Sequence, residues 1–184
     1  MSKPTVVVFC GHNSKLQSDA LDLARKATGH QQVQYVSGLE LDYLKSEGLT
    51  AEAFAQLDAE RAAHFLVGYF QFLLTEINAR VQRRSRQQNV VVLDASPFAV
   101  LAHLCAAYPT TLFSRHLMCV ELKKWVARVR PVLLYVKTKE STTDSLAHDS
   151  DLFALLRDCC ADVTADVDTP SALLRVLNTL ISKV

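Results

Sequence analysis

The sequence is poor in glycine and proline and has no long apolar run, and each shortage excludes a class of protein. Five glycines and five prolines among 184 residues leave no linker, internal repeat or low-complexity tract. The uncharged apolar stretches fall short of the ~18 residues that a membrane-spanning helix requires. Because this length is ample for one hydrophobic core, we expect a single domain over residues 1–184.

An excess of charge of one sign is also lacking. Twenty Lys and Arg residues face 19 Asp and Glu residues, which gives a formal net charge of +1. Such a chain has no global field that would recruit nucleic acid or a membrane. The first residues contain neither the apolar core of a signal peptide nor an Arg-rich presequence. We expect an intracellular protein, with the cytoplasm as its compartment and no membrane partner.

The cysteines and histidines lack the spacings of known frameworks. The cysteines are odd in number and include no C-x-x-C pair: Cys10, Cys105, Cys119, Cys159 and Cys160. The six histidines include no H-x-x-x-H or H-x-E spacing. We therefore expect reduced thiols, no disulfide framework and no zinc site.

Short apolar runs alternate with helical patterns along the chain, which indicates an α/β fold. Four runs suit strands buried on both faces, and a fifth is weaker: Thr5–Cys10, Val33–Val36, Asn89–Asp94, Pro131–Lys137 and, weakly, Asp162–Val167. Helical patterns cover the segments between and after them: Leu16–Thr28, Leu39–Glu47, Ala51–Gln87, Phe98–Tyr108, Ser114–Arg128, Asp151–Cys160 and Ser171–Lys183. The prediction is a three-layer fold with a parallel sheet of about five strands and helices on both faces.

The stretch Ala51–Gln87 is too long for an average helix, so we expect a break near Asp58–Ala62. Its middle, His64–Leu74, is apolar on nearly every side and predicts a helix buried against the sheet. Thr50 has the character of an N-cap, and Pro170 suits the first turn of a helix.

The loop from Gly11 to Ser18 lies between the first strand and the first helix, which is the setting of a phosphate-binding P-loop. On the pattern G-x-x-x-x-G-K-[ST], Gly11 and Ser18 fit. Leu16 stands in place of the second glycine, and Gln17 stands in place of the lysine. The loop therefore keeps the frame of a nucleotide site and lacks its two most demanding parts.

A working P-loop binds phosphate through backbone N–H groups, and its lysine neutralises the transferred phosphate. The Leu16 side chain would crowd the phosphates, and Gln17 carries no charge. If the loop is functional, its ligands for Mg-ATP or another nucleotide are predicted among five residues: Gly11, Asn13, Ser14, Lys15 and Ser18. The alternative, which we favour against catalysis, is that Gly11 makes a tight turn and that Ser18 or Asn13 caps the helix.

A second candidate is Asp94, at the end of the apolar strand that begins at Asn89. In α/β proteins this position is used for a carboxylate that contacts magnesium or acts as a general base. We expect Asp94 to face the loop after the first strand, where it and Ser18 would hold Mg²⁺ if a nucleotide binds.

The motif around Asp94 resembles a known family. Asp94-Ala-Ser-Pro97 followed by Ala99-Val-Leu-Ala-His103 is similar to the Asp-Arg-Ser-Pro-x-Asp-x-x-Ala-Tyr signature of the P-loop nucleoside and nucleotide kinase-like ATPases. The likeness covers residues 4–137. It implies the kinase-like fold and a role for Glu40, after the second strand, in contacting the acceptor substrate. The explanation that we favour for Glu40 is a solvated carboxylate in the first turn of a helix.

The departures from that family all fall on charged working groups. Ala95 replaces an arginine, Ala99 an aspartate and His103 a tyrosine, and the segment 138–148, where the family has lid arginines, contains only Lys139 as a cation. Phosphoryl transfer depends on charge neutralisation and positioning. We interpret the chain as a degenerate, non-catalytic member that binds one or more protein partners as an assembly module and needs no cofactor.

Two alternatives remain open at this point. The chain could be an active nucleoside or nucleotide phosphotransferase in which Lys15 replaces the missing lysine, and Asp94 or Glu40 acts as the base. It could also sense a nucleotide without turning it over.

Two basic segments could bind partners outside that site. The first is a cluster of four arginines: Arg80, Arg83, Arg84 and Arg86. These cations suit a helix C-terminus, and the alternative is a patch for RNA phosphates or an acidic protein. The only tryptophan, Trp125, lies on a basic amphipathic pattern and is expected in the core, with a partner-binding face as the alternative.

Overall fold

The computed structural model describes residues 3–10, 19, 21–22, 25–26, 33–83, 90–108, 112–136, 152, 154–156, 163–167 and 170–181. The predicted phosphate loop, Gly11–Ser18, and the segment 138–148 lie outside these residues.

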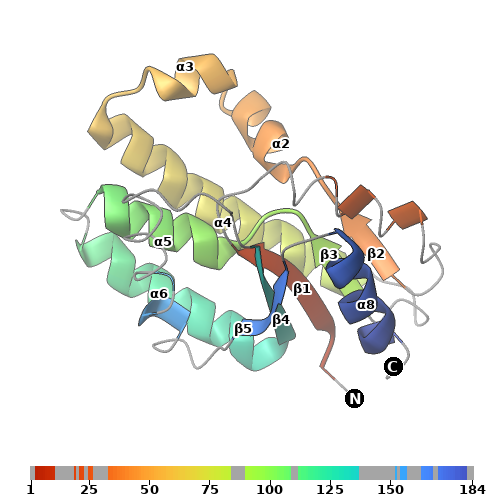
Figure 1. Cartoon of the computed structure of the whole chain (residues 1–184). Coiled ribbons are helices and arrows are strands. Elements are labelled where there is room, and N and C mark those ends of the chain that lie inside the picture. The colour runs from red at the N-terminus through yellow and green to blue at the C-terminus, as the bar shows by residue number, and fades with distance from the viewer. Residues whose placement is uncertain are drawn as a thin grey trace.

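Five parallel strands form one sheet in the order β2-β3-β1-β4-β5 (Figure 1). The strands are β1 (Thr5–Cys10), β2 (Val33–Val36), β3 (Val90–Leu93), β4 (Arg130–Val136) and β5 (Val163–Val167). Each lies where a strand was predicted, every end is within one residue of its predicted position, and the weak fifth candidate is a strand. The predicted α/β class with a parallel sheet is confirmed.

Register places the ends of the central strands at one edge of the sheet. Thr5 of β1 pairs with Val90 of β3, and Val8 pairs with Leu93. Valine dominates both strands, and Val6, Val7, Val91 and Val92 are fully buried. Such β-branched runs fit a strand that is covered on both faces. Because β3 ends at Leu93, Asp94 follows at the edge where β1 also ends.

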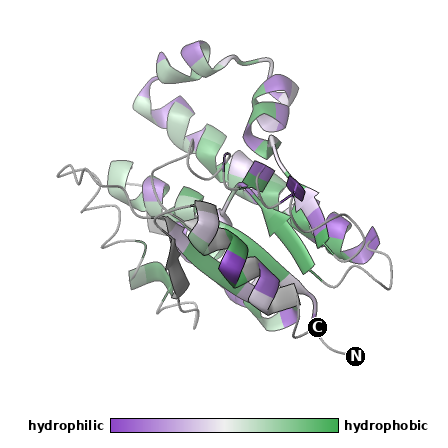
Figure 2. Cartoon of the chain, turned by 45° about the vertical axis from the view of Figure 1, so that its right-hand side comes forward, coloured by the Kyte–Doolittle hydropathy of each residue, from purple (hydrophilic) through white to green (hydrophobic). Residues whose placement is uncertain are grey.

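Helices cover both faces of the sheet. They are α2 (Leu39–Ser46), α3 (Ala51–Ala55), α4 (Ala59–Arg83), α5 (Pro97–Ala107), α6 (Leu112–Arg128) and α8 (Pro170–Ile181). One core joins the sheet to α2, α4, α5 and α6, and a smaller core joins the other face to Leu21 and α8. Figure 2 shows the central strands as hydrophobic and the polar residues gathered on the helices. Pro170 begins α8, as predicted.

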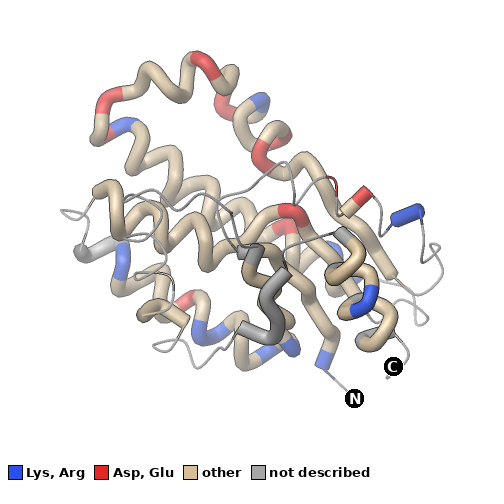
Figure 3. The backbone as a smooth tube through the Cα atoms, in the orientation of Figure 1, with Lys and Arg blue, Asp and Glu red and all other residues tan. Residues whose placement is uncertain are grey.

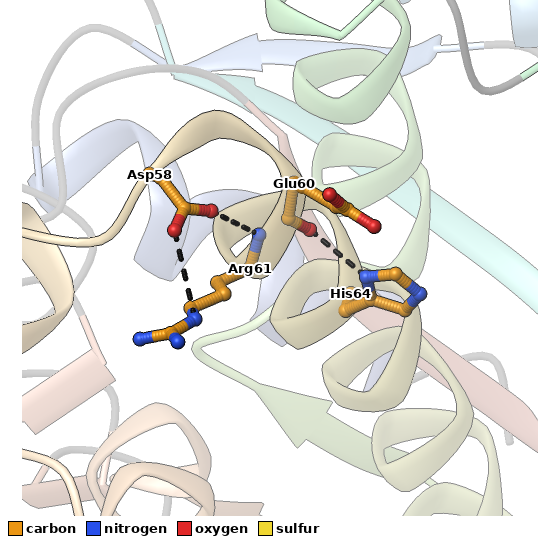
Figure 4. Close-up of polar contacts among 4 residues, drawn as sticks. All are labelled: Asp58, Glu60, Arg61 and His64. Atoms are coloured by element: carbon orange, nitrogen blue, oxygen red, sulfur yellow. Dashed lines mark hydrogen bonds and ion pairs between the residues drawn. The ribbon is translucent and has the colours of Figure 1, made fainter.

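The break in the long helical stretch comes earlier than the predicted Asp58–Ala62. α3 ends at Ala55 and α4 begins at Ala59. Asp58 caps the new helix, because the Arg61 N–H donates to Asp58 Oδ1 at 2.8 Å, and the two side chains also form an exposed ion pair of 3.5 Å (Figure 4). The cap fixes the first turn and leaves only residues 56–58 outside a helix.

α4 is the buried helix that the composition of His64–Leu74 predicts, although His64 and Gln71 are exposed. Gly68 gives the ring of Tyr43 room to pack, since a Cβ at residue 68 would overlap the Tyr43 hydroxyl. The Tyr43 ring also lies 4.9 Å from that of Phe65 and 5.5 Å from that of Tyr69. This aromatic cluster holds α2 on α4. In the described part of the chain, no helix is both long enough and apolar enough to cross a bilayer.

Candidate functional site

The candidate site lies where β2 and β3 end and α2 begins. Gly38 is the N-cap of α2 and has a left-handed backbone, with φ at +79°, which glycine adopts without strain. The Gly38 N–H donates to Asp94 Oδ2 at 2.7 Å, and the Asp94 N–H donates to the Val36 carbonyl at 3.2 Å. Asp94 therefore links the end of β3 to the turn between β2 and α2.

The environment of Asp94 disfavours its charged form. Burial raises the pKa of the Asp94 carboxyl and outweighs the hydrogen bonds from the Gly38 and Asp94 N–H groups, while the charge of Asp42 raises it further. Oδ1 is buried and accepts no hydrogen bond from any residue that the structure describes. Burying a charged carboxylate oxygen without a hydrogen bond costs free energy, so the protonated form of Asp94 is favoured in the folded protein.

Tyr69 of α4 belongs to the same site. Its side chain is only 6% exposed. Burial raises the pKa of its hydroxyl above the ordinary range, and the charges of Glu40 and Asp94 raise it further. Asp94 and Glu40 are therefore close enough to affect the Tyr69 hydroxyl, and the Tyr69 ring lies 5.5 Å from that of Tyr43 in α2. The sequence analysis missed Tyr69, and the available signal was a hydroxyl-bearing ring inside an otherwise apolar helix.

Glu40 lies in the first turn of α2 and is exposed. Its carboxylate is favoured there by the helix dipole, which supports the solvated-carboxylate explanation. Proximity to Tyr69 is consistent with the acceptor-contact role as well, and that role stays a prediction.

The residues after Asp94 have structural roles. Ser96 is buried and caps α5, because the Ala99 N–H donates to its hydroxyl at 3.3 Å, and Pro97 occupies the first turn. Ala95 packs against the main core. His103 is exposed on α5, with its ring edge-on to Tyr108 at 6.4 Å. Ala95 therefore serves packing, and Ser96 and Pro97 begin α5.

The predicted ligands of the phosphate loop are Gly11, Asn13, Ser14, Lys15 and Ser18, and all lie outside the described residues. The proposed magnesium pair of Ser18 and Asp94 therefore stays a prediction. Among the residues that can be described, no group of three or more His, Cys, Asp or Glu side chains is arranged to hold a metal ion.

Half of the arginine cluster is visible. Arg80 forms an ion pair of 3.6 Å with Glu76, and Arg83 lies exposed in the last turn of α4. Arg84 and Arg86 lie beyond the described residues. The visible pair fits cations at a helix C-terminus, and RNA binding stays a prediction.

Comparison with known proteins finds a similar fold but no similar sequence. No protein-family model matches the sequence, and no curated protein matches it. The structure is similar to the crystal structure of NadR protein in complex with NAD and AMP-PNP, with a TM-score of 0.67 and 12% sequence identity. The match covers 98% of this chain and 49% of that one, so this chain spans about half of the protein it resembles. At this identity the likeness shows the fold alone, which is a P-loop kinase-like α/β fold.

Proposed function

We propose that this kinase-like protein does not transfer phosphoryl groups and acts as a binding module in an assembly with other proteins. The observation that carries the proposal is the state of Asp94. A magnesium-shell carboxylate or a general base needs an oxygen that a metal-bound water or a substrate can reach. In Asp94 one oxygen accepts the Gly38 N–H at 2.7 Å and the other is buried. The side chain serves the fold.

The charges that would balance a transferred phosphate are also missing from the described part of the site. Ala95 stands where the resemblance places an arginine. α2 brings Glu40 and Asp42 to the site, with Lys45 at its other end. This arrangement disfavours an anionic acceptor. Leu16 and Gln17 extend the same pattern into the phosphate loop.

A second function is supported by the structural neighbour, which was crystallised with NAD and AMP-PNP. A nucleotide sensor, or an active Mg-ATP-dependent nucleoside or nucleotide phosphotransferase, would use the same edge of the sheet. In that case Lys15 would neutralise the phosphates, while Ser18 and Asp94 would hold Mg²⁺ and Asp94 or Glu40 would act as the base.

A transfer assay tests for the phosphotransferase. Purified protein is incubated with Mg²⁺, γ-³²P-ATP and a panel of nucleosides and nucleoside monophosphates, alongside Lys15→Ala and Asp94→Asn. We expect no labelled product above a no-protein blank and no difference among the three proteins. Product that Lys15→Ala reduces at least tenfold, in a variant that unfolds at the wild-type temperature, would establish the phosphotransferase instead.

Nucleotide sensing needs a separate measurement, because binding without turnover is silent in a transfer assay. Calorimetric titration with Mg·ATP and Mg·GTP, on wild type and Ser18→Ala, covers it. The proposal predicts no saturable heat. Micromolar binding weakened by Ser18→Ala would favour the sensor.

A further inference from the structure

A groove lies between α4 and α6, away from the candidate site at the end of β3. It encloses about 310 Å³. Its apolar lining comes from two helices: Phe70, Leu74, Leu117, Met118 and Trp125. We call this feature the α4–α6 groove. Its polar lining is as extensive: Gln71, Thr75, Asn78, Glu121, Lys124 and Arg128. A concave surface that combines apolar and polar side chains can bind the two sides of an amphipathic partner.

The floor and the rim of the groove differ in exposure. Trp125 is 2% exposed and its ring lies edge-on to that of Phe98 in α5, with centroids 6.0 Å apart. Its Nε1 is buried and donates no hydrogen bond to any described residue. Leu117 on the rim is 51% exposed. Trp and Arg are the residue types enriched among binding hot spots, and the groove contains Trp125 and Arg128.

The shape of the groove suits a helix. On α6 the lining residues Leu117, Glu121, Lys124 and Arg128 are spaced by four, three and four, so they share one side of the helix. At 1.5 Å per residue this side extends over about 16 Å. On α4 the lining residues Phe70, Leu74 and Asn78 are spaced by four. The α4 row extends over about 12 Å, so the two rows together can seat about two turns of a third helix.

The charge of the groove selects the partner. Lys124 is paired with Glu121 at 2.7 Å, so these two largely cancel. Arg128 is exposed and forms no ion pair with any residue in the described ranges. Lys123 and Arg115 add further positive charge on α6, and Glu121 is the helix's only carboxylate. Complementary charge guides association and excludes partners of the wrong sign.

We propose that the α4–α6 groove docks an acidic amphipathic helix of another protein. Its apolar side would lie on Trp125 and Leu117, and its Asp or Glu residues would face Arg128. The groove would be the surface through which the binding module binds its partner, so this inference rests on the proposed function.

The groove and the candidate site lie on different sides of α4. Phe65, Tyr69 and Phe72 face α2 and the aromatic cluster, while Phe70, Leu74 and Asn78 line the groove. At 100° per residue these two sets point in nearly opposite directions. Phosphoryl transfer and helix docking can therefore succeed or fail independently. Transfer activity with docking would overturn the proposed function alone, and inactivity without docking would overturn this inference alone.

The test starts from a displayed library of random 16-residue helices, selected on the full chain and counter-selected on Leu117→Asp. We expect enriched peptides with apolar residues at a spacing of three and four and an excess of Asp and Glu over Lys and Arg. Trp125 is the only tryptophan, so its emission reports occupancy when an enriched Trp-free peptide is titrated. Leu117→Asp should weaken binding at least tenfold, and Arg128→Glu at least threefold.

Matched controls come from α2, where Leu41 is 57% exposed and Lys45 is also exposed. Leu41→Asp and Lys45→Glu should leave peptide affinity unchanged within twofold. The proposal is overturned if no peptide survives counter-selection, if the enriched peptides are basic, or if Leu117→Asp and Leu41→Asp have equal effects. It is also overturned if Trp125 emission shifts with protein concentration alone and Leu117→Asp abolishes that shift, since the occupant would then be a second copy of this chain.

Discussion

The edge of the sheet at Asp94 and the groove between α4 and α6 use their polar groups in opposite ways. At the sheet edge, Asp94 accepts a backbone N–H of the turn before α2, and Ser96 caps α5. In the groove, Arg128 is exposed and Leu117 is 51% exposed. At the sheet edge, the described polar groups bind the backbone of neighbouring elements. The groups available to a partner lie on the helices.

Charge separates the molecule in the same way. Figure 3 shows acidic residues along α2, α3 and the start of α4, and basic residues along α6. The acidic side contains six carboxylates against Lys45 and Arg61: Glu40, Asp42, Glu47, Glu52, Asp58 and Glu60. This separation is why we propose an acidic partner beside α6 and no phosphate-bearing acceptor beside α2.

The largest effect on stability is expected from the groove floor. Trp125→Ala removes the ring that packs against Phe98 and should lower the free energy of unfolding by about 3–5 kcal/mol. Leu117→Ala, on the exposed rim, should change it by less than about 0.5 kcal/mol. Urea denaturation followed by circular dichroism measures both. If both variants lost the same unfolding free energy, Trp125 and Leu117 would not differ in burial as described.

The packing of α2 on α4 is tested at Gly68. Gly68→Ala places a methyl group against the Tyr43 hydroxyl and should cost about 1–3 kcal/mol of unfolding free energy. Tyr43→Phe removes the hydroxyl that this methyl group would meet. In that background Gly68→Ala should therefore cost less than half as much unfolding free energy. A double-mutant cycle that shows no coupling would contradict this account of α2.

Asp94 distinguishes a residue that serves the fold from one that serves catalysis. Asp94→Ala loses the hydrogen bond from Gly38 and should cost about 1–3 kcal/mol. Asp94→Asn keeps an acceptor and removes the buried charge, so it should be as stable as wild type or more stable at pH 7.

The pH dependence of Asp94 has a defined sign. The raised pKa of the Asp94 carboxyl means that the folded protein prefers the protonated form. Its contribution to stability is complete below the ordinary value of 3.8 and is lost as the pH rises through the folded-state pKa. The stability of Asp94→Asn relative to wild type should therefore increase from pH 3 to pH 7. A difference that stays constant, or that decreases, would contradict the burial of this charge.

The smallest effect is expected from the caps. Ser96→Ala should cost about 1 kcal/mol because Ser96 is buried and caps the helix after Asp94. Thr50→Ala removes the exposed cap of α3, where the Ala53 N–H donates to Thr50 Oγ1 at 3.1 Å, and should cost about half as much. Thermal unfolding ranks the two. A larger cost at Thr50 would remove the structural explanation of the Asp-Ala-Ser-Pro motif.

The strands were predictable because short valine-rich runs bounded by polar residues have few alternatives in an α/β chain. The position of Asp94 at the sheet edge followed from the same pattern. Its hydrogen bond to Gly38, 56 residues away, did not, because no local pattern records which backbone N–H a strand-end carboxylate will meet. Tyr69 and the α4–α6 groove were missed for a related reason: they arise from helices that meet only in three dimensions.

The central claim is that this kinase-like fold no longer seats a triphosphate, and one pair of titrations tests it directly. Mg·ATP is titrated calorimetrically into wild type and into Leu16→Gly/Gln17→Lys, which restores the glycine and the lysine of a P-loop between Gly11 and Ser18. We predict no saturable heat for wild type up to millimolar ligand and micromolar binding for the double variant. Micromolar binding by wild type would contradict the account.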